Sequence, residues 1–167
     1  ISGSNLYDEA ISGGDAETIF FDLAIDDLGR AADLLRTSWD VSGGTDGYVS
    51  LEVSPLLAAD ANTTIEQGIE LFKRADRPNL MIKVPGTPEG AEAVEELIFR
   101  GVNVNVTLLF DEAQYRTAAE AYIRGIERRL EAGLDAKVFS VASVFVSRWD
   151  TPTADLVGDD LKNKLGV

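Results

Sequence analysis

One lysine of the sequence stands where it could do covalent chemistry. Lys83 follows the apolar residues Leu80–Ile82 and precedes Pro85–Thr87, which places it near the carboxyl end of an expected strand. Burial at that position would favour the neutral amine, which can attack a carbonyl carbon. The alternative is a lysine that extends to solvent or serves as a structural partner of Glu52. The strand pattern alone leaves both interpretations open.

Three further polar residues lie on neighbouring expected strands. Glu52, beside Lys83, could hold a water molecule and move the protons that Schiff-base formation requires, or it could form half of a buried ion pair. Asn105 and Thr107 could form hydrogen bonds with substrate hydroxyls or with that water. Their alternative role is packing across the strands.

Arg148 comes just after the last expected strand, on which Ser143 lies between Val141 and Phe145. A guanidinium group can bind a phosphate through two parallel N–H donors. The alternative is a surface arginine that pairs with Asp150.

The elements that must position these residues are four segments in which apolar and polar residues alternate. They predict strands at Gly47–Ser54, Asn79–Val84, Val102–Phe110 and Val138–Val146. Side chains of a strand alternate between its two faces, so each strand has one apolar face, which would pack on helices. On the third strand the apolar face is Val102, Val104, Val106 and Leu108, and the polar face is Asn103, Asn105 and Thr107.

Helix signals separate these strands. Residues 1–46 are predicted to be helical with turns, and Asp15 precedes the stretch in which apolar residues recur at helical spacing. A second helix is predicted over Ile65–Ala75, with Thr63 and Glu66 as a capping box. The sequence further predicts helices from Thr87–Pro88 to Gly101, from Asp111 with Gln114 to near Gly133, and over Asp155–Leu165.

This alternation of strand and helix is typical of βαβ units around a parallel sheet. The sequence contains no Gly-x-Gly-x-x-Gly turn and no Walker loop, which disfavours a nucleotide-binding doubly wound sheet. Residues 1–167 therefore predict a single α/β domain that forms part of a (β/α)8 TIM barrel, with about four consecutive βα units after N-terminal helices. The polar strand faces would line the lumen of that barrel.

Composition narrows the possible chemistry. The 167 residues include no His and no Cys, which excludes a Ser–His–Asp or Cys–His triad, a cysteine-based zinc or iron–sulfur site, and a disulfide framework within this sequence. The net charge of −14 makes nucleic acid an unlikely partner, and no apolar run is long enough to span a membrane. Lack of cysteine fits a cytoplasmic setting.

The four strand segments resemble successive strand motifs of the transaldolases. The similar segments are Gly47–Pro55, Leu80–Thr87, Gly101–Phe110 and Ser140–Asp150, and the similarity extends to Ile1–Tyr7. The closest similarity is to the bacterial subfamily that has the motif Ile-Lys-Val-Pro-Gly-Thr.

The resemblance implies a Schiff-base enzyme of the pentose phosphate pathway that needs no metal or organic cofactor. Such an enzyme moves a dihydroxyacetone unit from fructose 6-phosphate or sedoheptulose 7-phosphate to an aldose phosphate. By resemblance, Lys83 is the Schiff-base lysine, Glu52 works through a catalytic water, and Thr107 is the second residue that holds this water.

The resemblance also implies that Asn105 and Ser143 bind the dihydroxyacetone unit and that Arg148 binds phosphate. It aligns the chain with the third to sixth strands of the barrel, so two strands, with an aspartate acid/base and a substrate-binding asparagine, would precede Ile1. Met81 is the only methionine, which also leads us to expect a piece of a longer protein. Such a piece alone is expected to be inactive.

Two alternatives remain. The first is an enzyme similar to fructose-6-phosphate aldolase, which shares the lysine but releases dihydroxyacetone. Members of that group tend to have Gln at the position of Glu52 and Tyr at the position of Phe145, so the residues present favour transaldolase. The second is a catalytically inactive half-barrel or an interaction domain. The sequence assigns no oligomeric state.

Overall fold

Four parallel strands form the centre of the molecule. The computed structural model describes residues 13, 15–146, 148–149 and 152, and the expected helix over Asp155–Leu165 lies outside these residues. The strands are β1 (Val49–Glu52), β2 (Leu80–Pro85), β3 (Val104–Leu109) and β4 (Ser140–Val144), and they lie side by side in sequence order. All four expected strands are therefore confirmed; β1, β3 and β4 are shorter than expected, and β2 begins and ends one residue later.

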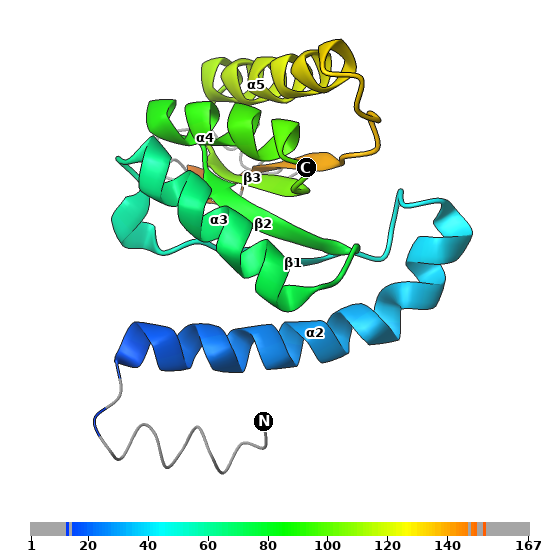
Figure 1. The fold of residues 1–167 in the computed structure, drawn as a ribbon. Coiled ribbons are helices and arrows are strands. Elements are labelled where there is room, and N and C mark those ends of the chain that lie inside the picture. Colours follow the sequence, from blue (N-terminus) through cyan, green and yellow to red (C-terminus); the bar gives the residue numbers. More distant parts are fainter. Residues whose placement is uncertain (1–12, 14, 147, 150–151, 153–167) are drawn as a thin grey trace, which may run out of the picture.

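Helices connect the strands and cover one face of the sheet. They are α2 (Ala16–Ser42), the 3-10 helix η1 (Pro55–Leu57), α3 (Ala61–Ala75), α4 (Pro88–Phe99) and α5 (Glu112–Glu131). Helices α3, α4 and α5 form one layer, and α2 runs beneath it (Figure 1). Because consecutive parallel strands are joined by right-handed crossovers, every connecting helix falls on the same side of the sheet. This arrangement is the α/β fold of a partial TIM barrel.

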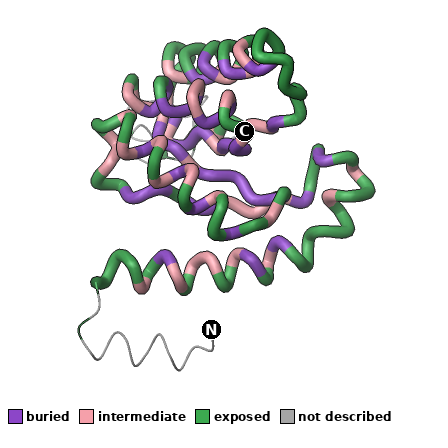
Figure 2. Tube along the Cα trace, in the orientation of Figure 1, coloured by how far each residue is buried: buried purple, intermediate pink, exposed green. Residues whose placement is uncertain are grey.

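The hydrophobic core lies between the sheet and these helices. Its fully buried members include Leu80, Ile82 and Val84 of β2 and Leu97 and Ile98 of α4. Figure 2 shows the buried residues running along the strands, while the outer faces of the helices are exposed. The alternation predicted from the sequence thus packs one face of β1, β2 and β3 on helices, whereas no residue of the edge strand β4 is buried among the described residues. No helix in the described part of the chain is long and apolar enough to cross a membrane.

The helix caps agree with the sequence at two of three helices. Thr87 caps α4 by accepting a hydrogen bond from Gly90 N, and Asp111 caps α5 by accepting one from Gln114 N. The predicted capping box of Thr63 and Glu66 is wrong. Helix α3 begins at Ala61, because the Asp60 carboxylate accepts a hydrogen bond from Thr63 N at 3.1 Å and so starts the helix earlier.

The predicted alternation is also wrong at one residue of β3. Leu108 was expected on the apolar face, but Leu109 is the residue that is fully buried in the core, and Leu108 is half-buried. The strand has a bulge between Val106 and Leu109, where its register with β4 shifts. An inserted residue reverses the faces of the residues that follow it.

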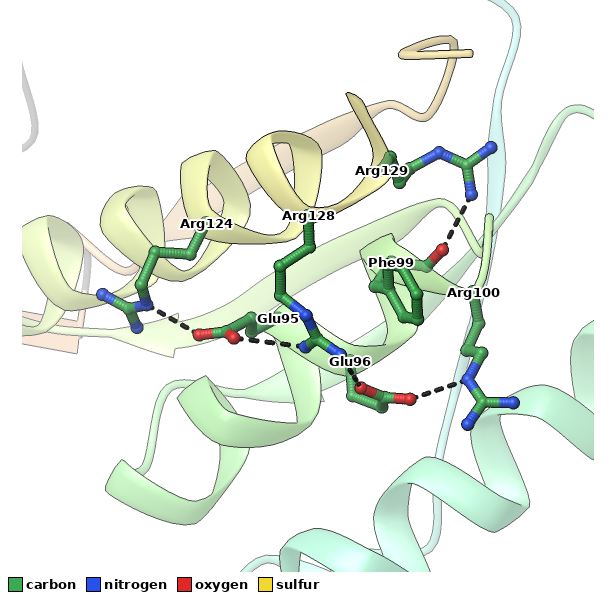
Figure 3. A network of polar contacts seen from close by, with 7 residues as sticks. All are labelled: Glu95, Glu96, Phe99, Arg100, Arg124, Arg128 and Arg129. Atoms are coloured by element: carbon green, nitrogen blue, oxygen red, sulfur yellow. Dashed lines mark hydrogen bonds and ion pairs between the residues drawn. The ribbon is translucent and has the colours of Figure 1, made fainter. Parts of the chain in front are cut away.

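An ion-pair network joins α4 to α5 on the outer surface (Figure 3). Arg128 bonds to Glu95 Oε1 at 3.2 Å and to Glu96 Oε2 at 2.7 Å, and Arg124 Nε bonds to Glu95 Oε2 at 2.6 Å. The Arg128 guanidinium also lies 4.3 Å from the centre of the Phe99 ring. Several charges held together in this way stabilise more than isolated surface pairs do.

The network predicts a pH-dependent contribution to stability. Burial acts to raise the pKa of Glu96, but hydrogen bonds from Arg100 and Arg128 outweigh it, and the pKa lies below its ordinary value of 4.5. A carboxylate with a lowered pKa stabilises the fold above its unfolded pKa, and this contribution is lost as pH falls through the folded value. We expect Glu96→Gln to lower the free energy of unfolding at pH 7 by roughly 1 kcal/mol.

Urea denaturation at a series of pH values measures this effect. The difference from the wild type should shrink as pH falls below 4.5. Glu92→Gln is the control, because Glu92 is exposed on the same helix and forms no ion pair within the described residues. Equal effects of the two substitutions, or an effect of Glu96→Gln that does not vary with pH, would contradict this account.

Candidate active site

The strand register brings three polar side chains into a row across the sheet. Glu52 of β1 is the Cα partner of Lys83 of β2, and Lys83 is the partner of Asn105 of β3. Partner residues of neighbouring parallel strands point to the same face. These side chains therefore lie on the face opposite the helices, near the carboxyl ends of the strands, where barrel enzymes carry their active sites.

Lys83 and Glu52 form a loose pair. Lys83 Nζ lies 3.9 Å from Glu52 Oε2, and the side chains are 28% and 47% exposed. This separation is too long for a direct hydrogen bond. Within the described residues both side chains are partly exposed, so the pair is not buried there. The distance leaves the Glu52 carboxylate free to accept a hydrogen bond from water or substrate while it remains close to the amine.

The Asn105 side chain links three strands. Its Nδ2 donates to Ser50 Oγ of β1 at 3.2 Å, and its Oδ1 accepts from Ser143 Oγ of β4 at 2.8 Å. The two bonds fix the orientation of the amide next to Lys83. Ser50 was not among the predicted site residues. The signal was present, since Ser50 lies two residues before Glu52 and therefore on the same face.

Thr107 follows Asn105 on the same face of β3 and is only 1% exposed. Its carbonyl oxygen accepts a hydrogen bond from Gly86 N at 2.8 Å. Its hydroxyl has no hydrogen-bond partner among the described residues. Buried hydroxyls are nearly always bonded, so this group is available to a ligand or water on the polar face.

Asn103 shares this face at the opposite end of β3, but its groups are occupied. Its Nδ2 donates to Pro78 O at 2.9 Å, and its Oδ1 accepts from Phe139 N at 3.0 Å. These bonds tie together the beginnings of β2, β3 and β4. Asn103 therefore has a structural role, and the unoccupied polar groups of β3 lie toward the carboxyl end.

Arg148 is not joined to this group. It is exposed, and its guanidinium carbon lies 4.8 Å from the centre of the Phe145 ring, which itself contacts Phe110. Within the described residues no hydrogen bond or ion pair connects Arg148 to the polar residues of the strands. The alternative pairing with Asp150 involves a residue outside the described part. A guanidinium held by an aromatic ring keeps its N–H groups free for an anion.

The structure thus groups five of the six predicted residues on one strand face. They are Glu52, Lys83, Asn105, Thr107 and Ser143. An amine beside a carboxylate, with an amide and two hydroxyls around it, can form and hydrolyse an imine and can hold a polyhydroxylated substrate. In the described part of the chain, no three His, Cys, Asp or Glu side chains gather so that they could hold a metal ion.

Comparison with known proteins agrees with this constellation. A family model described as transaldolase/fructose-6-phosphate aldolase matches residues 1–167. The chain belongs to this family. Its membership confirms the resemblance of the four strand motifs, and the parallel sheet confirms the expected fold class.

Several curated relatives of this family are named transaldolase. The relative from Thiobacillus denitrificans is 46% identical over 92% of the chain, and that from Mycolicibacterium paratuberculosis is 45% identical over 89%. The relative from Mycolicibacterium smegmatis is 42% identical over the whole chain. The aligned parts make up 43%, 40% and 48% of these relatives, so the chain spans less than half of their length.

Proposed function

We propose that the protein containing this chain is a transaldolase. The observation that carries the proposal is the placement of Lys83 beside Glu52 and Asn105 on the polar face of a parallel sheet. The names of the curated relatives support the same activity. The substrates would be a ketose phosphate donor, such as fructose 6-phosphate or sedoheptulose 7-phosphate, and an aldose phosphate acceptor. This reaction would belong to the pentose phosphate pathway in the cytoplasm.

Lys83 would be the nucleophile. Its amine adds to the C2 carbonyl of the ketose, and the resulting carbinolamine loses water to give an imine. Glu52, 3.9 Å from Nζ, would move the required protons through a water molecule. Thr107, two residues after Asn105 on β3, would hold that water through its buried hydroxyl.

Cleavage of the C3–C4 bond then releases an aldose phosphate and leaves a three-carbon enamine on Lys83. The proton of the C4 hydroxyl must pass to a base, which the resemblance places before Ile1. The enamine adds to the acceptor aldehyde, and hydrolysis of the new imine frees the product and the lysine. Asn105 and Ser143, whose mutual hydrogen bond fixes both groups, would hold the hydroxyls of the dihydroxyacetone unit.

A fructose-6-phosphate aldolase is the second candidate, because the family model covers both activities. The two enzymes share the imine and differ in whether the three-carbon unit is transferred or released. Glu52 and Phe145 favour transfer, as does the name of the relatives. An inactive half-barrel or interaction domain would not need the available amine and hydroxyl on the polar face.

The decisive prediction concerns Lys83. Borohydride added to the complete protein with fructose 6-phosphate should reduce an imine, and peptide mapping should place the three-carbon adduct on Lys83. Lys83→Arg should abolish the adduct, whereas Lys73→Arg, at an exposed position on α3, should retain it. With erythrose 4-phosphate present, a transaldolase forms sedoheptulose 7-phosphate, while an aldolase accumulates free dihydroxyacetone. A label on another lysine, or no label on folded protein, would refute the proposal.

The second prediction concerns Arg148. Loss of a charge-assisted bond to phosphate typically costs about 1.5–3 kcal/mol, so Arg148→Ala should raise the Michaelis constant for fructose 6-phosphate by roughly 10- to 150-fold. Transfer from an unphosphorylated ketose donor should change little. Arg116→Ala is the matched control, because Arg116 is an exposed arginine paired with Glu112 on α5. Equal losses with both kinds of donor would mean that Arg148 does not bind phosphate.

A further inference from the structure

Leu108 has an unusual backbone conformation beside the candidate site. Its φ angle is +59°, in the left-handed region that branched side chains rarely adopt. Asp76 is the other non-glycine residue with positive φ among those described, and it ends helix α3, where this conformation is common. Leu108 instead lies within strand β3, directly after Thr107. Strain of this kind tends to occur where the surrounding structure requires a particular geometry.

The strain coincides with the bulge in β3. On the side of β2 the register is regular up to the pair Pro85 and Thr107. On the side of β4 the partners change from Val106 with Ala142 to Leu109 with Val144. Between these two pairs β3 advances by three residues and β4 by only two, so β3 contains one extra residue. Bulges occur often beside active sites, where they redirect a side chain.

The extra residue places Leu109 on the face opposite that of Thr107. In a regular strand these two residues would share one face. In the structure Leu109 is fully buried in the core on the helix side, where a Cβ at Gly86 would overlap its Cδ2. Thr107 remains on the polar face. The left-handed turn at Leu108 therefore lets Thr107 serve the site while Leu109 fills the core.

Hydrogen bonds hold the backbone on both sides of Leu108. The Thr107 carbonyl accepts from Gly86 N at 2.8 Å, and the Leu109 carbonyl accepts from Phe145 N at 2.9 Å. The first bond ties the strand to the residues after β2, and the second ties it to those after β4. Leu108 is the residue at which the chain must rotate between these two fixed points.

We infer that Leu108 is a positioning residue, whose left-handed backbone lets Thr107 stay on the same face of the sheet as Lys83 while Leu109 is held in the core. This role rests on the proposed transaldolase function and deepens it. Leu108 touches no substrate in this account. Its contribution is the conformation of its backbone, so it should depend on how readily a substituted residue adopts positive φ and not on the size of its side chain.

A substitution series separates these two possibilities. Glycine and asparagine adopt positive φ readily, alanine less so, and β-branched valine least. We expect the kcat of the complete protein to fall in the order Leu108→Gly and Leu108→Asn, then Leu108→Ala, then Leu108→Val. Leu108→Val should lose at least about tenfold in kcat, with a Michaelis constant within about threefold of the wild type. If packing of the side chain mattered, valine would retain the most activity and glycine the least.

Circular dichroism should show that each variant is folded at the assay temperature. The Leu108 series should then be repeated with Thr107→Ala. Because the effect acts through Thr107, kcat should no longer vary along the series in that background. A reversed order, equal kcat values, or an unchanged series in the Thr107→Ala background would overturn the inference. Failure of the wild type to form an imine on Lys83 would instead refute the proposed function itself, and this role with it.

Discussion

The register of β1, β2 and β3 is the constraint on which the candidate site depends. Parallel strands in register place partner side chains on the same face, so Glu52, Lys83 and Asn105 must lie in one row. A shift of one residue in any strand would move its polar residue into the core beneath the helices. The buried residues Leu80, Ile82 and Val84 resist such a shift, because they would have to leave the core. The packing of the helix layer thus holds the chemistry of the opposite face in place.

The hydrogen bonding of the polar side chains changes from the beginnings of the strands to their carboxyl ends. Toward the beginnings of the strands, Asn103 uses its amide to join neighbouring backbones. Two residues further along β3, the Asn105 side chain forms hydrogen bonds with Ser50 and Ser143. Beyond it, the Thr107 hydroxyl has no hydrogen-bond partner among the described residues, as is also the case for Trp39 Nε1, Thr63 Oγ1 and Asn79 Oδ1 elsewhere in the fold. Along β3, structural bonding therefore gives way to an available hydroxyl toward the carboxyl end of the strand, where barrel enzymes carry their active sites.

Much of this could be predicted from the sequence, because period-two alternation is a local signal that tertiary packing reinforces. It identified the four strands and the shared face of Glu52, Lys83, Asn105 and Thr107. The exposure of Lys83 and Glu52 could not be predicted, since it depends on which surfaces the rest of the protein covers. The bulge at Leu108 was missed because a leucine gives no sign of a positive φ, and the Asp60 cap was missed because Thr63 offered a competing signal.

We propose above that this polar face is the substrate-binding surface of a Schiff-base enzyme. A crystal structure of the complete protein, reduced with borohydride in the presence of fructose 6-phosphate, tests it most directly. We expect electron density that continues from Lys83 Nζ into a three-carbon unit, whose hydroxyls lie within hydrogen-bond distance of Asn105 and Ser143. Density for the sugar on another lysine, or a three-carbon unit directed away from Asn105 and Ser143, would contradict it.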